Sequence, residues 1–226
     1  MKKFLSVSDL HGRKRWMDWI LRVVSDYDAL LLPGDLLNSL AYDFAREYVK
    51  IGEFLAELDK VGRPVLICTG NHDLDLFNRL PACARDLKNV YWDRASPLIA
   101  GVRMRIIGYM AELPVTSRED VIWLYHEPPH NSPTSLDRRT RESFGCPSLS
   151  HAAIFEAQSL PPLVISGHQH SPANWSWCNG RTLFLNSGQD FESFKPRHLI
   201  IELSVEQKMA VIKHSSHQNI VRHSWK

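Results

Sequence analysis

The first seventy residues alternate between short apolar runs and longer segments with helical periodicity. Three runs are short enough to be buried strands: residues 4–8, 29–32 and 64–68. Between them, residues 13–26 and 40–60 repeat apolar side chains at intervals of three or four, as helices packed on a sheet do. We expect Trp16, Trp19 and Phe44 of these helices to lie in the core. A β-α-β-α-β order joins its strands by right-handed crossovers, so it predicts a parallel sheet covered by helices.

The second half of the chain has strand-like segments at closer spacing, at residues 90–92, 97–100, 103–109, 121–125, 163–166, 198–203 and 209–213. Asn179-Gly180 lies between two further strand-like runs, which is a strong hairpin signal. Parallel pairing in the first half and hairpins in the second predict an α/β fold. The expected architecture is a four-layer α/β/β/α sandwich of two mixed β-sheets flanked by helices. With 226 residues, a single domain over 1–226 is favoured.

Composition narrows the cellular setting more than the activity. A hydrophobic content of 44% and a charged content of 23% are ordinary for a soluble globular protein. The net charge of +2 neither indicates nor excludes nucleic acid as a partner. No stretch reaches the roughly 18 apolar residues of a membrane span, and the apolar start is too short for a secretion signal. The four cysteines are scattered and show no metal-binding spacing, which fits a reduced compartment. Together these features lead us to expect a cytoplasmic protein with no membrane partner.

Five short polar segments, most of them directly after an apolar run, combine Asp, Asn and His. They are Asp9-Leu10-His11-Gly12, Gly34-Asp35-Leu36-Leu37-Asn38, Gly70-Asn71-His72-Asp73, Tyr125-His126-Glu127 and Gly167-His168-Gln169-His170. Functional side chains of open α/β sheets collect at the carboxyl ends of the strands. Carboxylate and amide oxygens mixed with imidazoles suit divalent ions such as Mn, Fe, Zn or Ni. A shared carboxylate can hold two ions about 3.5–4 Å apart, so the segments predict a two-metal centre.

Taken together, these segments resemble the calcineurin-like metallophosphoesterase superfamily, whose signature reads DxH, GDxx(D/N), GNH(D/E), H and GHxH. All five parts are present in order, over roughly residues 5–190. The resemblance implies two divalent ions as cofactors, with Mn favoured and Fe, Zn, Ni or Mg as alternatives. It implies that the first ion is held by Asp9, His11, Asp35 and His170. It implies that the second ion is held by Asp35, Asn71, His126 and His168, so that Asp35 bridges the two.

The resemblance gives His72 a role other than metal binding. His72 would protonate the leaving group as a general acid, and Asp73 beside it would orient the imidazole. The implied reaction is hydrolysis of a phosphoester. A metal-bridging hydroxide would attack phosphorus, and no covalent enzyme intermediate would form.

Departures from other branches of the superfamily narrow the expected activity. Protein phosphatases of the superfamily carry one Arg after the second motif and one before the third, where this chain has Asn38-Ser39-Leu40 and Thr69. Lipid-A pathway pyrophosphatases have Arg in place of His72, and recombination nucleases carry an appended capping domain. The segment His126-Glu127-Pro128-Pro129 resembles the His-x-Pro-Pro form found in small uncapped members, which include phosphodiesterases. A phosphodiesterase acting on a small-molecule phosphodiester is therefore favoured.

Two alternatives stay open at this point. A small-molecule phosphomonoesterase would use the same two metals on a phosphoester with one ester arm. A non-catalytic protein-interaction scaffold of the same fold, such as a subunit of the retromer coat, has lost parts of the signature, notably the His that is present here as His72.

The remaining segments are expected to surround the site rather than build it. Residues 130–149 form a long aperiodic stretch, which is typical of a substrate or lid loop. Its three arginines, at 138, 139 and 141, are expected to be solvated rather than to grip phosphate. Residues 214–226 are expected to form a frayed tail. The side chains expected not to bind metal are Glu127, His130, His151 and His198.

Overall fold

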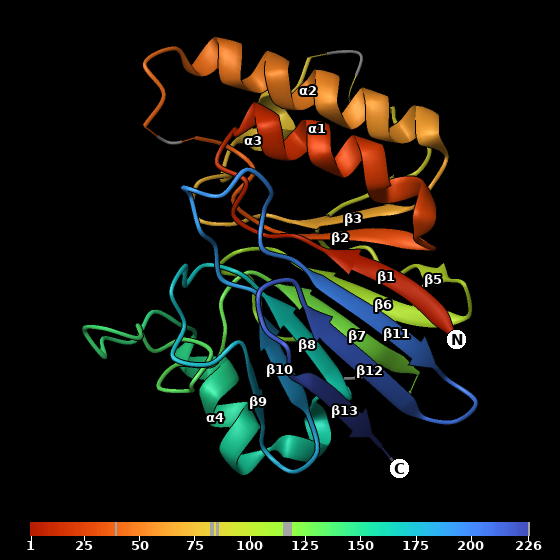
Figure 1. Cartoon of the computed structure of the whole chain (residues 1–226), viewed down its shortest axis with the longest axis vertical. Helices are drawn as coiled ribbons and strands as arrows, with labels where there is room; N and C mark the ends of the chain where they lie inside the picture. Colours follow the sequence, from red (N-terminus) through yellow and green to blue (C-terminus); the bar gives the residue numbers. More distant parts are fainter. Residues whose placement is uncertain (39, 82–83, 85, 115–118, 226) are drawn as a thin grey trace.

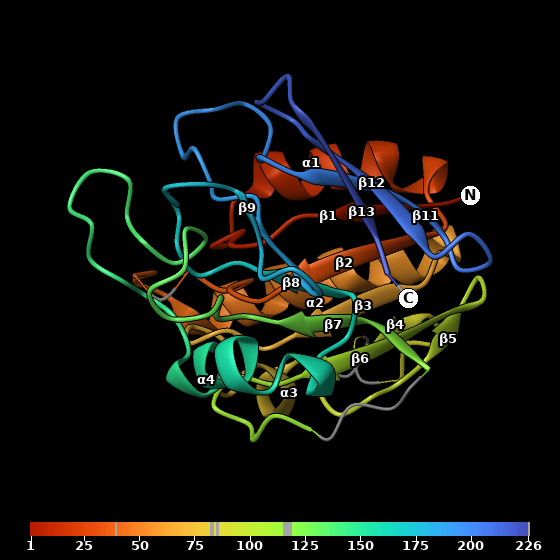
Figure 2. The ribbon, with the colours of Figure 1, turned by 90° about the horizontal axis from the view of Figure 1, so that it is seen from below.

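The computed structural model describes residues 1–38, 40–81, 84, 86–114 and 119–225. Two mixed β-sheets pack face to face, and helices cover their outer faces (Figures 1 and 2). The predicted four-layer sandwich is confirmed. Ser39, Cys83 and Lys226, which entered the sequence predictions, lie outside the described residues.

The first sheet has seven strands in the order β13-β12-β11-β1-β2-β3-β4. Strands β1 to β4 pair in parallel, as the crossover pattern predicts, whereas β11, β12 and β13 add antiparallel neighbours at one side. Their bounds are β1 Lys2–Ser6, β2 Ala29–Pro33, β3 Val65–Cys68, β4 Val90–Tyr91, β11 Leu199–Ser204, β12 Met209–His214 and β13 Ile220–Ser224.

The second sheet has six strands in the order β5-β6-β7-β8-β10-β9. Strands β6, β7, β8 and β10 are parallel, and β5 and β9 close the two edges in antiparallel pairs. The predicted Asn179-Gly180 hairpin is confirmed, since it joins β9 to β10. The bounds are β5 Leu98–Ile99, β6 Val102–Ile107, β7 Asp120–Tyr125, β8 Leu163–Ser166, β9 Ser176–Cys178 and β10 Leu183–Asn186.

Helices lie outside both sheets, so three apolar layers separate the four structural layers. Helices α1 (Lys14–Val23) and α2 (Phe44–Val61) pack on the first sheet, and α4 (Pro147–Phe155) packs on the second. A short helix, α3 (Leu76–Arg79), follows β3, and 3-10 turns occupy Val24–Asp26 and Ala157–Ser159. Strand β2 is apolar throughout because both of its faces are buried. Its Leu31 faces the other sheet, while Leu30 and Leu32 face the helices.

Two sequence predictions are wrong in detail. Helix α2 begins at Phe44, because the Asp43 carboxylate caps it by accepting a hydrogen bond from the Arg46 N–H, and Phe44 is 45% exposed rather than buried. The expected frayed tail contains strand β13, whose backbone pairs with β12. Val221 and Trp225 of this segment pack against the core between the sheets, so an edge strand replaces the predicted solvated tail.

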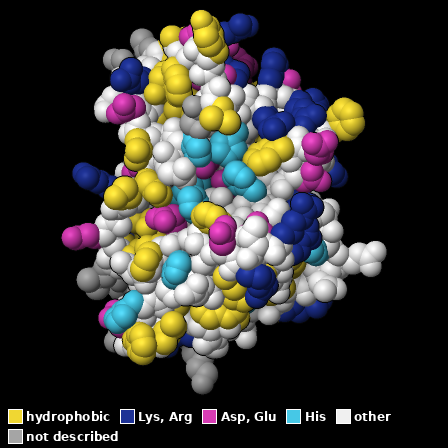
Figure 3. Space-filling model, turned by 90° about the vertical axis from the view of Figure 1, so that its left-hand side faces the viewer, with side chains coloured by type: hydrophobic (Ala, Val, Ile, Leu, Met, Phe, Trp, Pro, Cys, Tyr) yellow, Lys and Arg dark blue, Asp and Glu magenta, His cyan; other side chains and the backbone are white. Residues whose placement is uncertain are grey.

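Strands β1, β2 and β3 of one sheet and β7 and β8 of the other end at the same edge of the molecule. This edge is on the left in Figure 1 and faces the viewer in Figure 3, where the histidines (cyan) gather near its centre. Each of the five polar segments follows one of these five strands. No helix among the described residues combines the length and the apolar character that crossing a membrane requires.

Candidate metal centre

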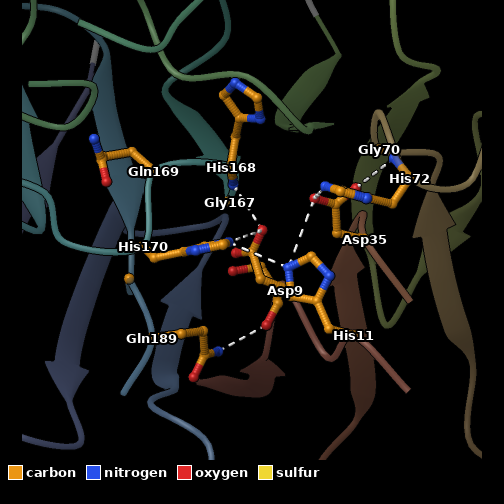
Figure 4. Close-up of polar contacts among 12 residues, drawn as sticks. Asp9, His11, Asp35, Gly70, His72, Gly167, His168, Gln169, His170 and Gln189 are labelled. Carbon is orange, nitrogen blue, oxygen red and sulfur yellow. Dashed lines mark hydrogen bonds and ion pairs between the residues drawn. The ribbon is translucent and has the colours of Figure 1, made fainter. Parts of the chain in front are cut away.

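The first group of candidate ligands joins two segments of one sheet to one segment of the other. Asp9, His11, Asp35 and His170 each offer a donor atom, and these atoms all lie within 4.8 Å of one another. The Nε2 atoms of His11 and His170 are 3.2 Å apart, and His170 Nε2 lies 3.6 Å from Asp9 Oδ1 (Figure 4). These four residues are the set expected for the first ion.

The second group shares Asp35 with the first. Donor atoms of Asp35, His126 and His168 also lie within 4.8 Å of one another. The amide oxygen of Asn71 lies 2.9 Å from His168 Nδ1 and 3.0 Å from His126 Nε2, so it belongs to the same cluster. The structure thus brings together all seven residues expected to hold metal, with Asp35 between the two groups.

The donor atoms are arranged as the ligands of a cation are. Imidazole nitrogens face each other twice, since His168 Nδ1 and His126 Nε2 are also 3.2 Å apart. The second ring nitrogen of His126 lies 2.8 Å from the Pro33 carbonyl oxygen, which fixes the ring and leaves Nε2 free for an ion. Asp9 Oδ2 is buried without a hydrogen-bond partner among the described residues, a costly condition that a bound cation would relieve. Oxygen and imidazole donors of this kind suit divalent ions.

Charge crowding shifts the protonation of these groups in opposite directions. Burial would lower the pKa of His126, but attraction to Asp35 and Asp9 outweighs it and raises the pKa to about 9. Burial and repulsion by His126 lower the pKa of His168 to about 4. Burial would raise the pKa of Asp35, but attraction to His126 outweighs it and lowers the pKa below its usual value. The cluster therefore holds carboxylate charge at neutral pH, as a cation site requires.

The backbone at the ligands is held in an uncommon conformation. Asp9, His11, Asp35 and His168 have φ values of 54°, 44°, 55° and 69°, in the left-handed region that side chains rarely adopt. Such strain persists where surrounding contacts enforce it, and it concentrates at functional sites. Here the Asp9 N–H donates to the Gly34 carbonyl and the His11 N–H to the Asp35 carbonyl, both at 3.0 Å. These bonds lock the first two ligand segments together.

Two glycines allow Asp35 and His126 to lie as close as they do. A Cβ atom on Gly34 would collide with His126 Nδ1, and Gly34 also has φ of 85°. A Cβ atom on Gly70 would collide with the Asp35 carboxylate. The glycines of the second and third segments are thus required by close approach of ligand atoms as much as by turn geometry.

His72 lies at the mouth of the cluster, in neither ligand group. Its backbone N–H donates to Asp35 Oδ1 at 3.0 Å, and its Nε2 lies 3.7 Å from Asp35 Oδ2. The side chain is 29% exposed, and its ring stands edge-on to that of His11 with centroids 5.0 Å apart. A partly exposed imidazole beside the shared carboxylate is available to a bound substrate.

Asp73 does not orient the His72 imidazole as the sequence predicts. Its carboxylate is buried and accepts backbone N–H bonds from Leu36, Leu37 and Gly70, at 3.2, 3.0 and 3.1 Å. Burial and the nearby Asp35 raise the pKa of Asp73 to about 6, although these three bonds oppose the rise. The carboxylate is engaged by these three backbone N–H groups, which belong to the second and third segments. Asp73 therefore ties the second and third segments together.

Sequence reasoning missed Asn186, which ends strand β10. Its side-chain amide is fully buried and donates to the carbonyl oxygens of Thr134, Gly167 and Gln169. Two of these carbonyls flank His168, so Asn186 holds the fifth ligand segment in place. The available signal was a polar residue after a buried apolar run, as at the other five strand ends.

Sequence reasoning also missed the segment after Asn186. The Phe191 ring lies edge-on to His170 and His11, with centroids 4.8 and 5.6 Å away, and it stacks on Trp16. The Gln189 side chain donates to the Ser8 carbonyl at 2.7 Å, which anchors this segment to the first ligand segment. An aromatic wall therefore closes one side of the first ligand group. No motif signalled it, since Phe191 contacts the histidines only through folding.

Residues 130–149, the predicted substrate or lid loop, fold into hydrogen-bonded turns that lead into helix α4. Thr134 and Ser135 are fully buried, and isolated bridges join Leu136 to Ser143 and Pro129 to Cys146. Its arginines at 138, 139 and 141 are exposed, as expected.

Glu127 accepts a hydrogen bond from the Tyr125 hydroxyl at 3.3 Å and belongs to neither ligand group. His198 is buried with Nδ1 3.0 Å from the Pro196 carbonyl oxygen, and His151 is exposed.

The family model of calcineurin-like phosphoesterases matches residues 2–172, which includes all five ligand segments. The chain belongs to the calcineurin-like phosphoesterase family. Membership of this family supports a hydrolase that acts on phosphoesters. No match was found among curated proteins.

Solved structures share the fold of this calcineurin-like phosphoesterase over its whole length. A dimetal phosphatase from Danio rerio is 12% identical with a TM-score of 0.63, covering 100% of this chain and 99% of that one. The protein TT1561 of Thermus thermophilus is 13% identical with a TM-score of 0.60, covering 99% and 98%. A novel archaeal phosphodiesterase is 16% identical with a TM-score of 0.52, covering 94% and 99%. At these identities the likeness establishes the fold alone.

Proposed function

We propose that this protein is a two-metal phosphodiesterase. The observation that carries the proposal is the pair of ligand groups that share Asp35 at the edge where five strands end. The names of two structural neighbours, a dimetal phosphatase and an archaeal phosphodiesterase, support the same chemistry. The substrate would be a small phosphodiester, without a membrane partner.

The residues of each group have distinct roles in this proposal. Asp9, His11, Asp35 and His170 would hold one ion, and Asp35, Asn71, His126 and His168 the other. The Asp35 carboxylate would be shared by the two ions, since its Oδ2 lies 3.4 Å from a nitrogen of the second group (His126) and 3.9 Å from one of the first (His11). When bound, two divalent ions supply an acidified water as nucleophile and neutralise charge on the phosphoryl oxygens. Mn is the favoured metal, with Fe, Zn, Ni or Mg as alternatives.

His72 would act as the general acid. Its backbone is fixed to Asp35 Oδ1, so the imidazole is held beside the shared carboxylate while one face stays open to substrate. A proton donated from this ring to the leaving oxygen would avoid release of an alkoxide, an effect worth about 10²–10⁴ in rate. Asp73 would assist indirectly, by holding the segment that carries His72.

The choice of a diester over a monoester rests on two features of the sequence. The chain has the form His126-Glu127-Pro128-Pro129, and it lacks the two arginines that protein phosphatases of this superfamily carry. The scaffold alternative is disfavoured, because the chain retains every ligand residue of the signature and His72, and these side chains lie together. The described cysteines, Cys68, Cys146 and Cys178, are free, which supports a cytoplasmic location.

The test compares bis-p-nitrophenyl phosphate with p-nitrophenyl phosphate. Metal-stripped protein would be assayed with Mn, Ni, Zn, Fe or Mg added back in turn. We expect a higher kcat/KM for the diester, restored by metal and lost in Asp35→Asn. A preference for the monoester would favour a phosphomonoesterase, and metal binding without turnover of either ester would favour the scaffold.

A further inference from the structure

Arg13 and Arg15, at the start of helix α1, converge on one backbone carbonyl. Arg13 Nη1 donates to the Phe191 carbonyl oxygen at 3.0 Å, and Arg15 Nη2 donates to the same oxygen at 2.5 Å. A carbonyl oxygen is neutral, so it brings two guanidinium groups together without cancelling their charge. Each guanidinium has five N–H donors, so most of them remain available.

No ion pair balances these two cations within the part of the chain that the structure describes. Asp18 pairs with Lys14 at 2.7 Å and Asp190 pairs with Arg197 at 3.8 Å, and Glu192 attracts Arg13 without an ion pair between described residues. Burial and the like charge of Arg15 lower the pKa of Arg13, and attraction to Glu192 only partly opposes them. The pair is therefore a local excess of positive charge.

This excess charge lies one aromatic ring away from the first ligand group. The Arg13 guanidinium lies 4.6 Å from the centroid of the Phe191 ring, which itself contacts His170 and His11. In Figure 3, Lys and Arg side chains (dark blue) flank one side of the histidine cluster on the same face. A substrate whose phosphate lies at the metal centre could thus reach both arginines with a second group.

The segment that brings the arginines together is rigidly attached. Gln189 Oε1 accepts from the Arg197 N–H at 3.0 Å while Nε2 binds the Ser8 carbonyl, which closes the base of the segment. Trp16 Nε1 donates to the Ser193 carbonyl at 3.1 Å, and its ring stacks on Phe191 at 5.6 Å. The two guanidinium groups are therefore arranged before a ligand arrives, which lowers the entropic cost of binding.

We propose that Arg13 and Arg15 form a subsite for a second phosphate of the substrate, separated by one sugar from the phosphodiester that is cleaved. Guanidinium groups bind phosphate through paired N–H donors, and two of them side by side match a doubly charged group. The substrate class is a phosphodiester that carries a further phosphate, such as a nucleotide ester phosphorylated on the other hydroxyl of its sugar. This inference rests on the proposed phosphodiesterase function.

The test uses two esters that differ by one phosphate. Thymidine 5′-(p-nitrophenyl phosphate) and its 3′-phosphorylated form release the same p-nitrophenolate, so the leaving group is constant. We expect the wild-type protein to prefer the 3′-phosphorylated ester by about tenfold in kcat/KM, the effect of one charge-assisted hydrogen bond. Arg15→Gln should lose most of this preference and leave bis-p-nitrophenyl phosphate hydrolysis within about twofold. Lys14→Gln is the matched control, because Lys14 is exposed and pairs with Asp18 instead.

The outcomes separate the subsite from the underlying activity. Equal kcat/KM for the two thymidine esters in the wild type, or an unchanged preference in Arg15→Gln, would overturn the subsite. If the wild-type protein hydrolyses none of the three esters, the proposed function itself would be overturned. Calorimetry with thymidine 3′,5′-bisphosphate and thymidine 5′-monophosphate then tests the subsite without turnover. Tighter binding of the bisphosphate that is lost in Arg15→Gln supports it, and equal binding of the two nucleotides refutes it.

Discussion

The Asn186→Asp substitution tests whether one buried amide holds the fifth ligand segment. The side-chain nitrogen donates to the carbonyl oxygens of Thr134, Gly167 and Gln169 at 3.0, 2.8 and 3.0 Å, and the side-chain oxygen accepts from the Gly188 N–H at 2.8 Å. Aspartate has the same shape but places a carboxylate oxygen where two N–H donors were. An ionised carboxylate would face three carbonyl oxygens, so the folded protein should bind a proton instead.

The cost follows from the proton and the missing donor. Keeping an aspartic acid neutral costs about 1.4 kcal/mol per pH unit above its ordinary pKa of about 3.9, or about 4 kcal/mol at pH 7. The acid has one hydrogen where the amide has two, and the lost hydrogen bond adds about 1 kcal/mol. We expect the free energy of unfolding to fall by about 5 kcal/mol at pH 7 and about 2.5 kcal/mol at pH 5. The loss grows with pH because the folded state keeps a proton that the unfolded state releases.

Urea unfolding at pH 5 and pH 7, with a chelator present throughout, measures this difference. Asn131→Asp is the control, because Asn131 is exposed and has φ of 58°, which Asp tolerates. The control should change the free energy of unfolding by less than about 0.5 kcal/mol at both pH values. An equal destabilisation of Asn186→Asp at the two pH values would refute the reasoning.

Three further predictions concern the site and the carboxyl-terminal strand. Phe191→Ala should weaken binding of the first ion about tenfold and spare the second, since Phe191 contacts His11 and His170; calorimetric metal titration against a Phe194→Ala control would check it, and equal weakening of both ions would contradict it. His72→Ala should keep both ions and lose about 10²–10⁴ in kcat for a diester with an alkoxide leaving group, such as a dinucleotide, and lose far less for bis-p-nitrophenyl phosphate, whose p-nitrophenolate leaves without a proton; unchanged turnover of the dinucleotide would remove His72 from the mechanism. Deleting residues 219–226 should lower the free energy of unfolding by about 2–4 kcal/mol, because Val221 and Trp225 leave the core; an unchanged urea midpoint would mean that the segment is a tail after all.

The sandwich and its metal-ligand segments were readable from local patterns. Short apolar runs such as residues 29–32 are typical of buried strands, and the helical segments between them favour parallel pairing. Polar residues that follow such runs in one parallel sheet meet at one edge, which groups Asp9 with Asp35, and the family resemblance added His168 to Asp35. Their grouping agrees with the structure, in which Asp35 belongs to both ligand groups.

Two predictions made from local sequence alone were wrong, because the partner of the polar group lies elsewhere in the fold. Asp73 follows His72, which suggested a pair, yet the Asp73 carboxylate accepts from Leu36 and Leu37 on another segment. The polar composition of residues 214–226 suggested solvation, yet strand β12 offers backbone groups that β13 pairs with. In both cases backbone groups elsewhere in the fold needed hydrogen-bond partners, and the segment that satisfied them took its position accordingly.

The sequence by itself determined the fold class and the identity of the ligand segments, because burial period and strand order are local properties of the chain. Only the tertiary structure decided what surrounds the ligands. Asn186 and Phe191 contact the ligand segments across the fold, and Arg13 and Arg15 meet at a carbonyl from a distant segment. Such contacts depend on how two sheets and their loops pack against each other, and no spacing along the chain encodes them.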